Sequence, residues 1–249
     1  MGIKFFVTSD IHSYLTPLIK ALDKAGFNPN DELHWLIICG DCFDRGHESK
    51  NLLKYLMSLK RKIIIKGNHD ILLERLYERG YPYRYDYSNG TVQTMWDIGA
   101  GADTIDDVYD YAYNLLKPYR NELKNYFETQ KYIFVHSWIP TKYIERSDAD
   151  GVKLIEHKFN PEWRDANDIE WEDAMWVNPF EQWQSGLNQT GKTIIFGHWH
   201  CSTGHKISGA TSLEYDKWEP FYGDNIIAID RCTAYTGDVN VIVLEDDFI

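Results

Sequence analysis

Short apolar runs alternate with segments of helical spacing along the first third of the chain. The apolar runs, which predict strands, are Lys4–Thr8, His34–Cys39 and Lys62–Lys66. The segments with helical spacing, which predict helices, are Leu15–Gly26, Glu48–Leu59 and a helix beginning within Ile71–Tyr77. Strands and helices that alternate with short links predict right-handed βαβ units and therefore an α/β fold.

The pattern is less regular in the middle of the chain. Tyr81, Tyr83, Tyr85 and Tyr87 alternate with other residues, which indicates a strand or an extended lid whose tyrosines pack or stack on a substrate. Asp103–Gln130 is predicted to be largely helical. The stretch 141–191 is rich in Trp, Asp, Asn and Glu without clear periodicity, which indicates a cap-like excursion. The remaining predicted strands are Lys131–Val135, Lys192–Phe196, Asn225–Ile229 and Val239–Leu244. We expect a single domain over residues 1–249, with insertions near 81–130 and 141–191.

Composition narrows the functional classes. A chain of 249 residues with 43% hydrophobic residues can bury one sizeable core. The net charge of -12 repels nucleic acid phosphates, so nucleic acid is not an expected partner. We see no signal peptide and no apolar run long enough for a membrane span, and we therefore expect a cytoplasmic protein without a membrane partner. The four scattered cysteines do not form a disulfide scaffold, although Cys39 and Cys42 formally spell a redox pair.

Polar residues that can bind metals follow five predicted strands at the point where each strand ends. They are Asp10 and His12, Asp41, Asn68, His136, and His198 with His200. Ligands of open α/β sheets bind outside the carboxyl ends of the strands, so these side chains should converge on one edge. An isolated histidine or a single Gly-Asn-His-Asp turn has an ordinary structural explanation. No packing requirement explains why all five strands end in such residues, and we predict a metal site.

The same motifs resemble those of the calcineurin-like metallophosphoesterases. The matching motifs are Asp10-x-His12, Gly40-Asp41-x-x-Asp44-Arg45-Gly46, Gly67-Asn68-His69-Asp70, His136 and Gly197-His198-x-His200. They occur in the family's order from near residue 5 to about residue 245. The resemblance implies an α/β fold with a central β-sandwich of mixed sheets flanked by helices. The Asp-Arg-Gly extension is similar to the branch that contains protein Ser/Thr phosphatases and diadenosine tetraphosphate hydrolases.

The resemblance also implies a role for each residue. One metal would be held by Asp10, His12 and His200, the other by Asn68, His136 and His198, with Asp41 bridging both. His69 would be the general acid, Asp44 would orient it, and Arg45 would grip the phosphate. Asn68 and Lys66 would also contact the substrate. Lys66 stands where the branch often has a phosphate-binding arginine, and Arg146 and Arg231 are further basic candidates.

Two divalent metal ions suit this set of ligands. Paired cations neutralise an anionic ester and lower the pKa of bound water, so that hydroxide becomes available near neutral pH. A carboxylate can bridge two ions because it has two oxygens. Mixed Asp, Asn and His ligands suit manganese, which we expect, and also iron or zinc.

The sequence therefore predicts two-metal hydrolysis of phosphate esters by metal-bound hydroxide. The leading interpretation is a phosphomonoesterase of the protein Ser/Thr phosphatase type, acting on a phosphorylated protein or a small phosphorylated molecule. The first alternative is a symmetrical dinucleoside tetraphosphate hydrolase, which Val135–Pro140 and Ile195–Trp199 resemble, and a nucleoside pocket in the middle insertion would distinguish it. The second alternative is a catalytically inactive binding scaffold, against which His69 and the full ligand set argue.

Overall fold

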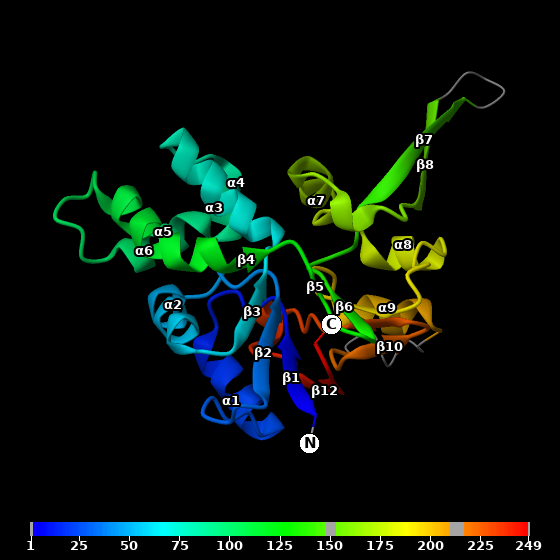
Figure 1. Ribbon diagram of the computed structural model, residues 1–249. Coiled ribbons are helices and arrows are strands. Elements are labelled where there is room, and N and C mark those ends of the chain that lie inside the picture. The colour runs from blue at the N-terminus through cyan, green and yellow to red at the C-terminus, as the bar shows by residue number, and fades with distance from the viewer. Residues whose placement is uncertain (1, 148–152, 210–216, 249) are drawn as a thin grey trace.

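The first of two central sheets carries the N-terminal βαβ units (Figure 1). The computed structural model describes residues 2–147, 153–209 and 217–248. The strand order is β12 (Ile242–Asp246), β1 (Ile3–Thr8), β2 (His34–Cys39), β3 (Lys62–Ile65) and β4 (Leu123–Lys124). β1 to β4 run parallel and β12 pairs with β1 antiparallel. The carboxyl ends of three of the predicted strands therefore meet at one edge.

The second sheet is also mixed. Its strand order is β10 (Phe221–Gly223), β11 (Ile226–Ala228), β9 (Thr193–Phe196), β6 (Tyr132–Phe134) and β5 (Phe127–Glu128). β11, β9 and β6 run parallel, whereas β10 and β5 are antiparallel to their neighbours. This sheet thus also presents parallel strand ends at one edge.

The two sheets pack on each other through alternate residues of their strands. Val7, Ile37 and Ile65 of the first sheet lie in one buried cluster with Phe134 and Ile195 of the second. The intervening residues point outward into two further clusters, which helices cover. Because both faces of each sheet are buried at its centre, the central strands are apolar throughout rather than alternating, as the sequence indicated.

Helices cover the outer face of each sheet. Those on the side of the first sheet are α1 (Leu15–Ala25), α2 (Ser49–Ser58), α3 (Asn68–Arg79), α4 (Arg84–Asn89), α5 (Thr91–Gly99) and α6 (Val108–Glu122). Those beside the second sheet are η1 (Trp163–Asp165), α7 (Asp168–Ala174), α8 (Pro179–Gln184) and α9 (Cys201–Ile207), and a short α10 (Thr233–Thr236) follows β11. The result is the predicted sandwich of mixed sheets flanked by helices.

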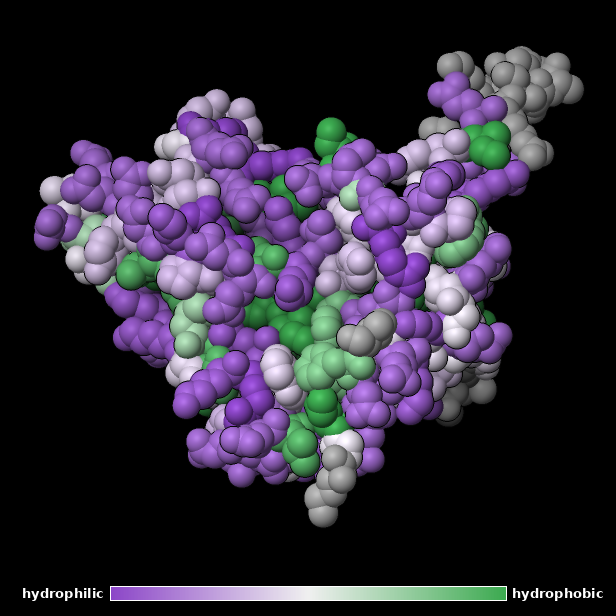
Figure 2. Space-filling model, in the orientation of Figure 1, coloured by the Kyte–Doolittle hydropathy of each residue, from purple (hydrophilic) through white to green (hydrophobic). Residues whose placement is uncertain are grey.

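A hairpin of β7 (Thr141–Ser147) and β8 (Lys153–Phe159) projects from the body beside α7 (Figure 1). The surface in this view is mostly hydrophilic, and apolar residues gather down the middle of the view, over the region of β4, β5 and β1 (Figure 2). No helix in the described part of the chain is both long and apolar enough to span a membrane.

Two predictions about the middle of the chain were wrong, and a third stretch has more regular structure than its pattern indicated. The Tyr81–Tyr87 stretch is no strand, because Asp86 caps the start of α4 by accepting hydrogen bonds from the Tyr83 amide at 2.6 Å and from Arg79 at 2.5 Å. Asp103–Gln130 is helical only over α6, since its last part pairs as β4 and β5. The 141–191 excursion has regular structure, with Trp163 and Trp171 buried against the second sheet. α5 and β10 were not predicted.

The start of α3 differs from the prediction, whereas the cysteines do not. α3 begins at Asn68 rather than within Ile71–Tyr77, because Asp70 accepts hydrogen bonds from the Gly67 amide at 2.8 Å and from the Tyr119 hydroxyl at 2.7 Å. These bonds cap the helix and anchor it to α6. All four cysteines are free, so no redox bridge joins Cys39 and Cys42.

Candidate metal centre

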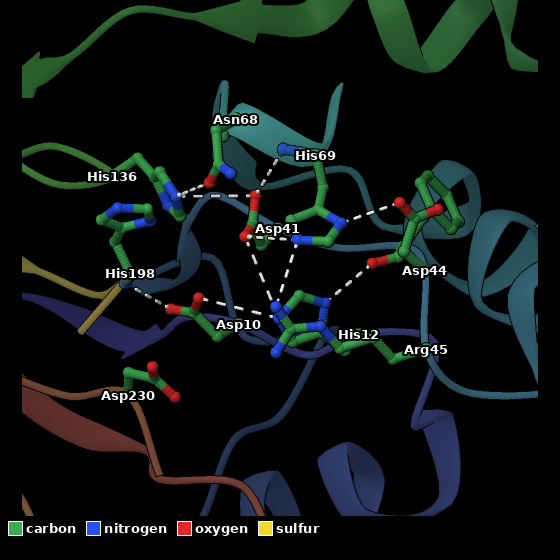
Figure 3. A network of polar contacts seen from close by, with 12 residues as sticks. Asp10, His12, Asp41, Asp44, Arg45, Asn68, His69, His136, His198 and Asp230 are labelled. Carbon is green, nitrogen blue, oxygen red and sulfur yellow. Dashed lines mark hydrogen bonds and ion pairs between the residues drawn. The ribbon is translucent and has the colours of Figure 1, made fainter. Parts of the chain in front are cut away.

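Six strand ends from the two sheets supply the polar residues of one buried site (Figure 3). β1, β2 and β3 of the first sheet lead into Asp10, Asp41 and Asn68. β6, β9 and β11 of the second sheet lead into His136, His198 and Asp230. All but His198 are buried, with at most 5% of each side chain exposed. The sheets therefore bring together residues that are up to 220 positions apart, from Asp10 to Asp230.

The backbone of these loops is strained. Non-glycine residues with positive φ include Asp10, His12, Asp41, Asp44, Arg45 and His198. L-residues rarely adopt this conformation, and such strain persists only where the surrounding structure over-determines it, which is common at functional sites. Gly67 and Gly197 allow the close approach, since an added Cβ would lie 2.1 Å from Asp41 Oδ1 and 2.0 Å from Asp10 Oδ2, respectively.

Asp41 lies at the centre of the site and belongs to two groups of potential ligands. The ligand atoms of His12, Asp41 and His69 lie within 4.8 Å of one another, as do those of Asp41, His136 and His198. Asp41 Oδ2 is 3.9 Å from His12 Nε2, and Oδ1 is 3.6 Å from His136 Nε2. The two carboxylate oxygens thus face different groups, which is the arrangement that a bridging ligand requires.

Two histidines are oriented so that Nε2 faces Asp41. His12 Nδ1 donates to the carbonyl of Phe43 and His136 Nδ1 to that of Cys39, each at 3.0 Å. Such bonds fix the ring orientation and leave the other nitrogen free for a metal. His136 Nε2 is also 2.7 Å from Asn68 Oδ1. Several electron-pair donors therefore converge on one point, an arrangement that a cation stabilises, so the residues present fit a metal.

The buried carboxylates repel one another. Burial and the Asp41 carboxylate raise the pKa of Asp10 to about 7, and burial with Asp10 raises the pKa of Asp230 to about 7. Burial would also raise the pKa of Asp41, but His136, His69, His12 and His198 together lower it below its ordinary value. Without added cations the site cannot easily hold all its negative charge.

His198 and His200 have different surroundings. The His198 amide donates to Asp10 Oδ2 at 2.9 Å, and burial next to His136 lowers the pKa of the His198 ring to about 3. The ring is therefore neutral, as a metal ligand must be. His200 lies outside both ligand groups among the described residues; its Nε2 is 3.9 Å from Asp230 Oδ2, and 40% of its side chain is exposed.

Asp230 was not predicted as a site residue. It is 3% exposed, and its Oδ1 accepts a 2.6 Å hydrogen bond from the Cys232 amide. The signal that would have found it was present, because Asp230 directly follows the predicted strand Asn225–Ile229. Asp230 thus occupies the same position after its strand as the predicted ligands do after theirs.

His69, Asp44 and Arg45 form a second arrangement at the edge of the centre. His69 Nδ1 donates to Asp44 Oδ2 at 2.7 Å, and Arg45 Nη2 lies 3.3 Å from His69 Nε2. Thr91 donates to the same Asp44 oxygen at 2.7 Å. Burial alone would lower the pKa of His69, but Asp41 and Asp44 raise it above its ordinary value. A histidine with a raised pKa can deliver a proton from Nε2 near neutral pH.

The other basic candidates lie apart from this centre. Lys66 Nζ donates to Glu74 at 3.2 Å and lines a neighbouring cavity. Arg231 turns away toward Asn240 and Asp238, at 3.1 Å and 3.7 Å. Arg146 is part of β7, and its side chain lies outside the described part of the structure. Of the three described basic candidates for phosphate binding, Arg45 is the one that contacts the centre, through His69, whereas Lys66 and Arg231 pair with residues elsewhere.

The sequence matches the model of the calcineurin-like phosphoesterase family over residues 3–202. It is 28% identical over 183 residues to a symmetrical bis(5'-nucleosyl)-tetraphosphatase of Pseudomonas entomophila, a match that covers 73% of this chain and 58% of that protein. A protein of the same name from Marinomonas sp. is 27% identical over 156 residues, covering 62% of this chain and 51% of that protein. The chain thus spans little more than half the length of these relatives.

A solved structure with similar architecture is that of a cold-active protein-tyrosine phosphatase of a psychrophilic Shewanella species. It has a TM-score of 0.56 and 16% sequence identity, and the match covers 98% of this chain and 76% of that one. At this identity the similarity shows a shared fold alone. It agrees with the two mixed sheets and flanking helices described above.

Proposed function

Because this chain belongs to the calcineurin-like phosphoesterase family, we propose that it is a metal-dependent phosphoesterase that cleaves dinucleoside tetraphosphates symmetrically. The position of Asp41 in two ligand groups is the observation that carries the metal-dependent part. The names of the relatives from Pseudomonas and Marinomonas support the substrate. A dinucleotide substrate is therefore preferred here over the phosphomonoester that the sequence motifs alone favoured.

The site would hold two divalent cations. Asp41 would bridge them. One ion would be held by Asp10, His12 and His200, and the other by Asn68, His136 and His198. The Asp230 carboxylate, 3.9 Å from His200 Nε2, would orient the His200 ring. The ions, with manganese the first candidate, would neutralise the phosphate oxygens and activate water. Their charge would also relieve the repulsion between the buried carboxylates.

The remaining residues of the centre would act on the substrate directly. Arg45 is exposed at the mouth of the site, and its planar guanidinium can donate two parallel hydrogen bonds to a phosphate. His69 Nε2 would donate a proton to the leaving oxygen, while the hydrogen bond from Nδ1 to Asp44 holds the ring in place. The negative charge of Asp44 also stabilises the protonated ring.

The test is a substrate panel on the manganese-loaded protein. Diadenosine tetraphosphate, a phosphoserine peptide and p-nitrophenyl phosphate would be compared by kcat/KM, and the nucleotide products separated by chromatography. We expect the dinucleotide to be the preferred substrate and ADP its sole product. Formation of AMP with ATP would contradict symmetrical cleavage. A preference for the phosphopeptide would restore the phosphomonoesterase, and no turnover with both metals bound would indicate a scaffold.

A further inference from the structure

A cavity of about 330 Å³ lies between α3, β4 and α7, where Figure 1 shows these elements facing one another. Its walls come from distant parts of the chain. Lys66 and Ile71 line it from the start of α3, Arg120 and Asn125 from the first insertion, and Met175 from the second. The cavity therefore exists only because the two insertions fold against the α3 side of the molecule.

The cavity borders the candidate metal centre. Lys66 is two residues before Asn68, and Ile71 lies in the first turn of α3. On the opposite wall, Met175 precedes Trp176, whose backbone forms a hydrogen bond with His198. Asn68 thus lies on the segment that forms one cavity wall, and the Trp176 hydrogen bond links the opposite wall to His198. A substrate held at the centre can extend into this space.

The lining favours an uncharged polar group over a phosphate. Glu74, Asp168 and Glu172 contribute three carboxylates, against the two cations of Lys66 and Arg120. Lys66 is already paired with Glu74 at 3.2 Å. Arg75 also neutralises Glu172, so the lining has no net positive charge to attract a phosphate. Its carboxylates can still accept hydrogen bonds from sugar hydroxyls and from the amino group of a base.

The cavity also has an apolar part that could contact a nucleobase. Ile71 and Met175 are 4% and 3% exposed, and both border the cavity. Ligand pockets typically combine apolar walls with a few polar groups, and their volumes begin at about 300 Å³. A nucleobase offers a flat apolar face for such side chains, and a methionine adapts easily to that face. A nucleoside fits both parts of this lining.

We propose that this cavity binds one nucleoside of the substrate while the phosphate chain lies at the metal centre. This inference rests on the proposed dinucleotide substrate. Arg75 of α3 forms a salt bridge with Glu172 of α7 and so joins the two walls. The two insertions would thus determine which substrate binds, because they form walls of the cavity. None of the proposed metal ligands, nor His69 or Arg45, lines the cavity.

The first experiment removes the cavity's features and measures selectivity. Glu172→Ala deletes a carboxylate, and Asn125→Trp fills the space. We expect each to lower the ratio of kcat/KM for diadenosine tetraphosphate to that for p-nitrophenyl phosphate by about 5–10-fold, the worth of roughly one hydrogen bond. Glu162→Ala is the matched control, because it removes an exposed carboxylate paired with Lys142 outside the cavity. An unchanged ratio in both cavity variants, with the wild type active on the dinucleotide, overturns the cavity and leaves the proposed function standing.

The second experiment tests the cavity without turnover. Adenosine would be titrated into the metal-loaded protein carrying methyl-labelled methionine, and the Met175 signal identified with a Met175→Leu variant. The chain has only four methionines, so the spectrum is simple. We expect adenosine to shift the Met175 methyl signal in the wild type but not in Asn125→Trp, and inorganic phosphate to leave it in place. No shift with adenosine in the wild type overturns the inference, whereas a shift in a protein that cleaves no dinucleotide refutes the proposed function alone.

Discussion

At the scale of single residues, the candidate centre is dominated by buried negative charge. Asp41 stays ionised because four histidines surround it, whereas burial and mutual repulsion raise the pKa values of Asp10 and Asp230 to about 7. The Arg45 guanidinium lowers the pKa values of Asp10, His12 and Asp230. Bound cations would supply the missing positive charge, so the same buried carboxylates that would ligate a metal also explain why the site would need one.

His69 could act either as a metal ligand or as a proton donor, and the two roles predict different effects of its substitution. Its Nε2 is 3.8 Å from Asp41, as a ligand could be, but 3.3 Å from the Arg45 guanidinium, which disfavours a second cation there. We expect His69→Asn to keep both metals and to lose about 10²–10⁴ in turnover. The loss should be larger on a phosphoserine peptide than on p-nitrophenyl phosphate, because an alkoxide needs the proton and p-nitrophenolate does not.

The measurement combines elemental analysis with rates on both substrates. Equal losses on the two substrates would remove His69 from the acid role. Loss of one metal from the purified variant would instead make it a ligand.

At the scale of elements, α5 supports the loop that carries Asp44 and Arg45. Thr91 at its start donates to Asp44 Oδ2, and the Asp44 amide donates to Thr94 Oγ1 at 3.0 Å. This contact joins residues 47 and 50 positions apart and restrains a loop in which Asp44 and Arg45 both have positive φ. The position of His69 therefore depends on a helix outside the sequence motifs.

Replacing Thr91 with Val removes its hydrogen bond to the Asp44 carboxylate with almost no change in side-chain volume. Asp44 would lose a hydrogen bond worth about 1 kcal/mol, and the His69 ring would be held less firmly. We expect kcat to fall by roughly 3–10-fold while metal content stays at the wild-type level. Thr104→Val is the matched control, because Thr104 donates to the exposed Asp107 far from Asp44. A Thr91→Val enzyme as fast as this control would show that α5 has no part in catalysis.

Glu128 on β5 holds together three segments around the second sheet. It accepts hydrogen bonds from Arg164 at 2.8 and 2.5 Å and lies 2.8 Å from Lys192. Burial would raise the pKa of Glu128, but Arg164 and Lys192 together lower it below its ordinary value. A group with a lowered folded-state pKa adds stability above its unfolded pKa and loses it as the pH falls through the folded value.

We therefore expect Glu128→Gln to lower the free energy of unfolding by about 1–2 kcal/mol at pH 7. The difference from the wild type should shrink as the pH falls through the lowered folded-state pKa, because the wild-type carboxyl then becomes protonated. Urea unfolding over a series of pH values from 7 downward measures it. Glu162→Gln, which breaks an exposed pair with Lys142, should change little at any pH of the series. A deficit of Glu128→Gln that stays constant over the whole series would point to lost packing instead of lost charge.

At the scale of the whole molecule, the centre joins the two sheets. Asp41 and Asn68 come from the first sheet, and His136 and His198 from the second, while a shared apolar cluster packs the sheets together. Metal binding to the folded state alone stabilises it by about 3–4 kcal/mol at metal concentrations 100 to 1,000 times Kd. Folding and metal binding should therefore be strongly coupled.

We expect the manganese-loaded protein to unfold in one thermal transition, as a single domain does. Removing the metal with EDTA should lower Tm by roughly 5–15 °C. Asp41→Asn weakens both ligand groups at once, so its Tm should respond little to EDTA. Calorimetry on the two proteins with and without chelator decides the question; two separate transitions, or an equal shift in Asp41→Asn, would contradict this coupling.

The sequence by itself determined the elements whose pattern is local. β2 was predicted to the residue and α1 to within one residue, because apolar runs and helical spacing are properties of neighbouring positions. The ligand-type residues were recognisable for the same reason, since each directly follows an apolar strand. The same rule applied to the strand before Asp230 would have added that residue.

The tertiary structure alone decided what depends on contacts between distant positions. The second sheet buried the tryptophans of a segment without a visible period. The division of the two Asp41 oxygens between ligand groups, the Thr91 support of Asp44 and the cavity between the insertions have no local signature. Each arises from side chains that meet only after the two sheets have packed, and no spacing along the chain encodes such a meeting.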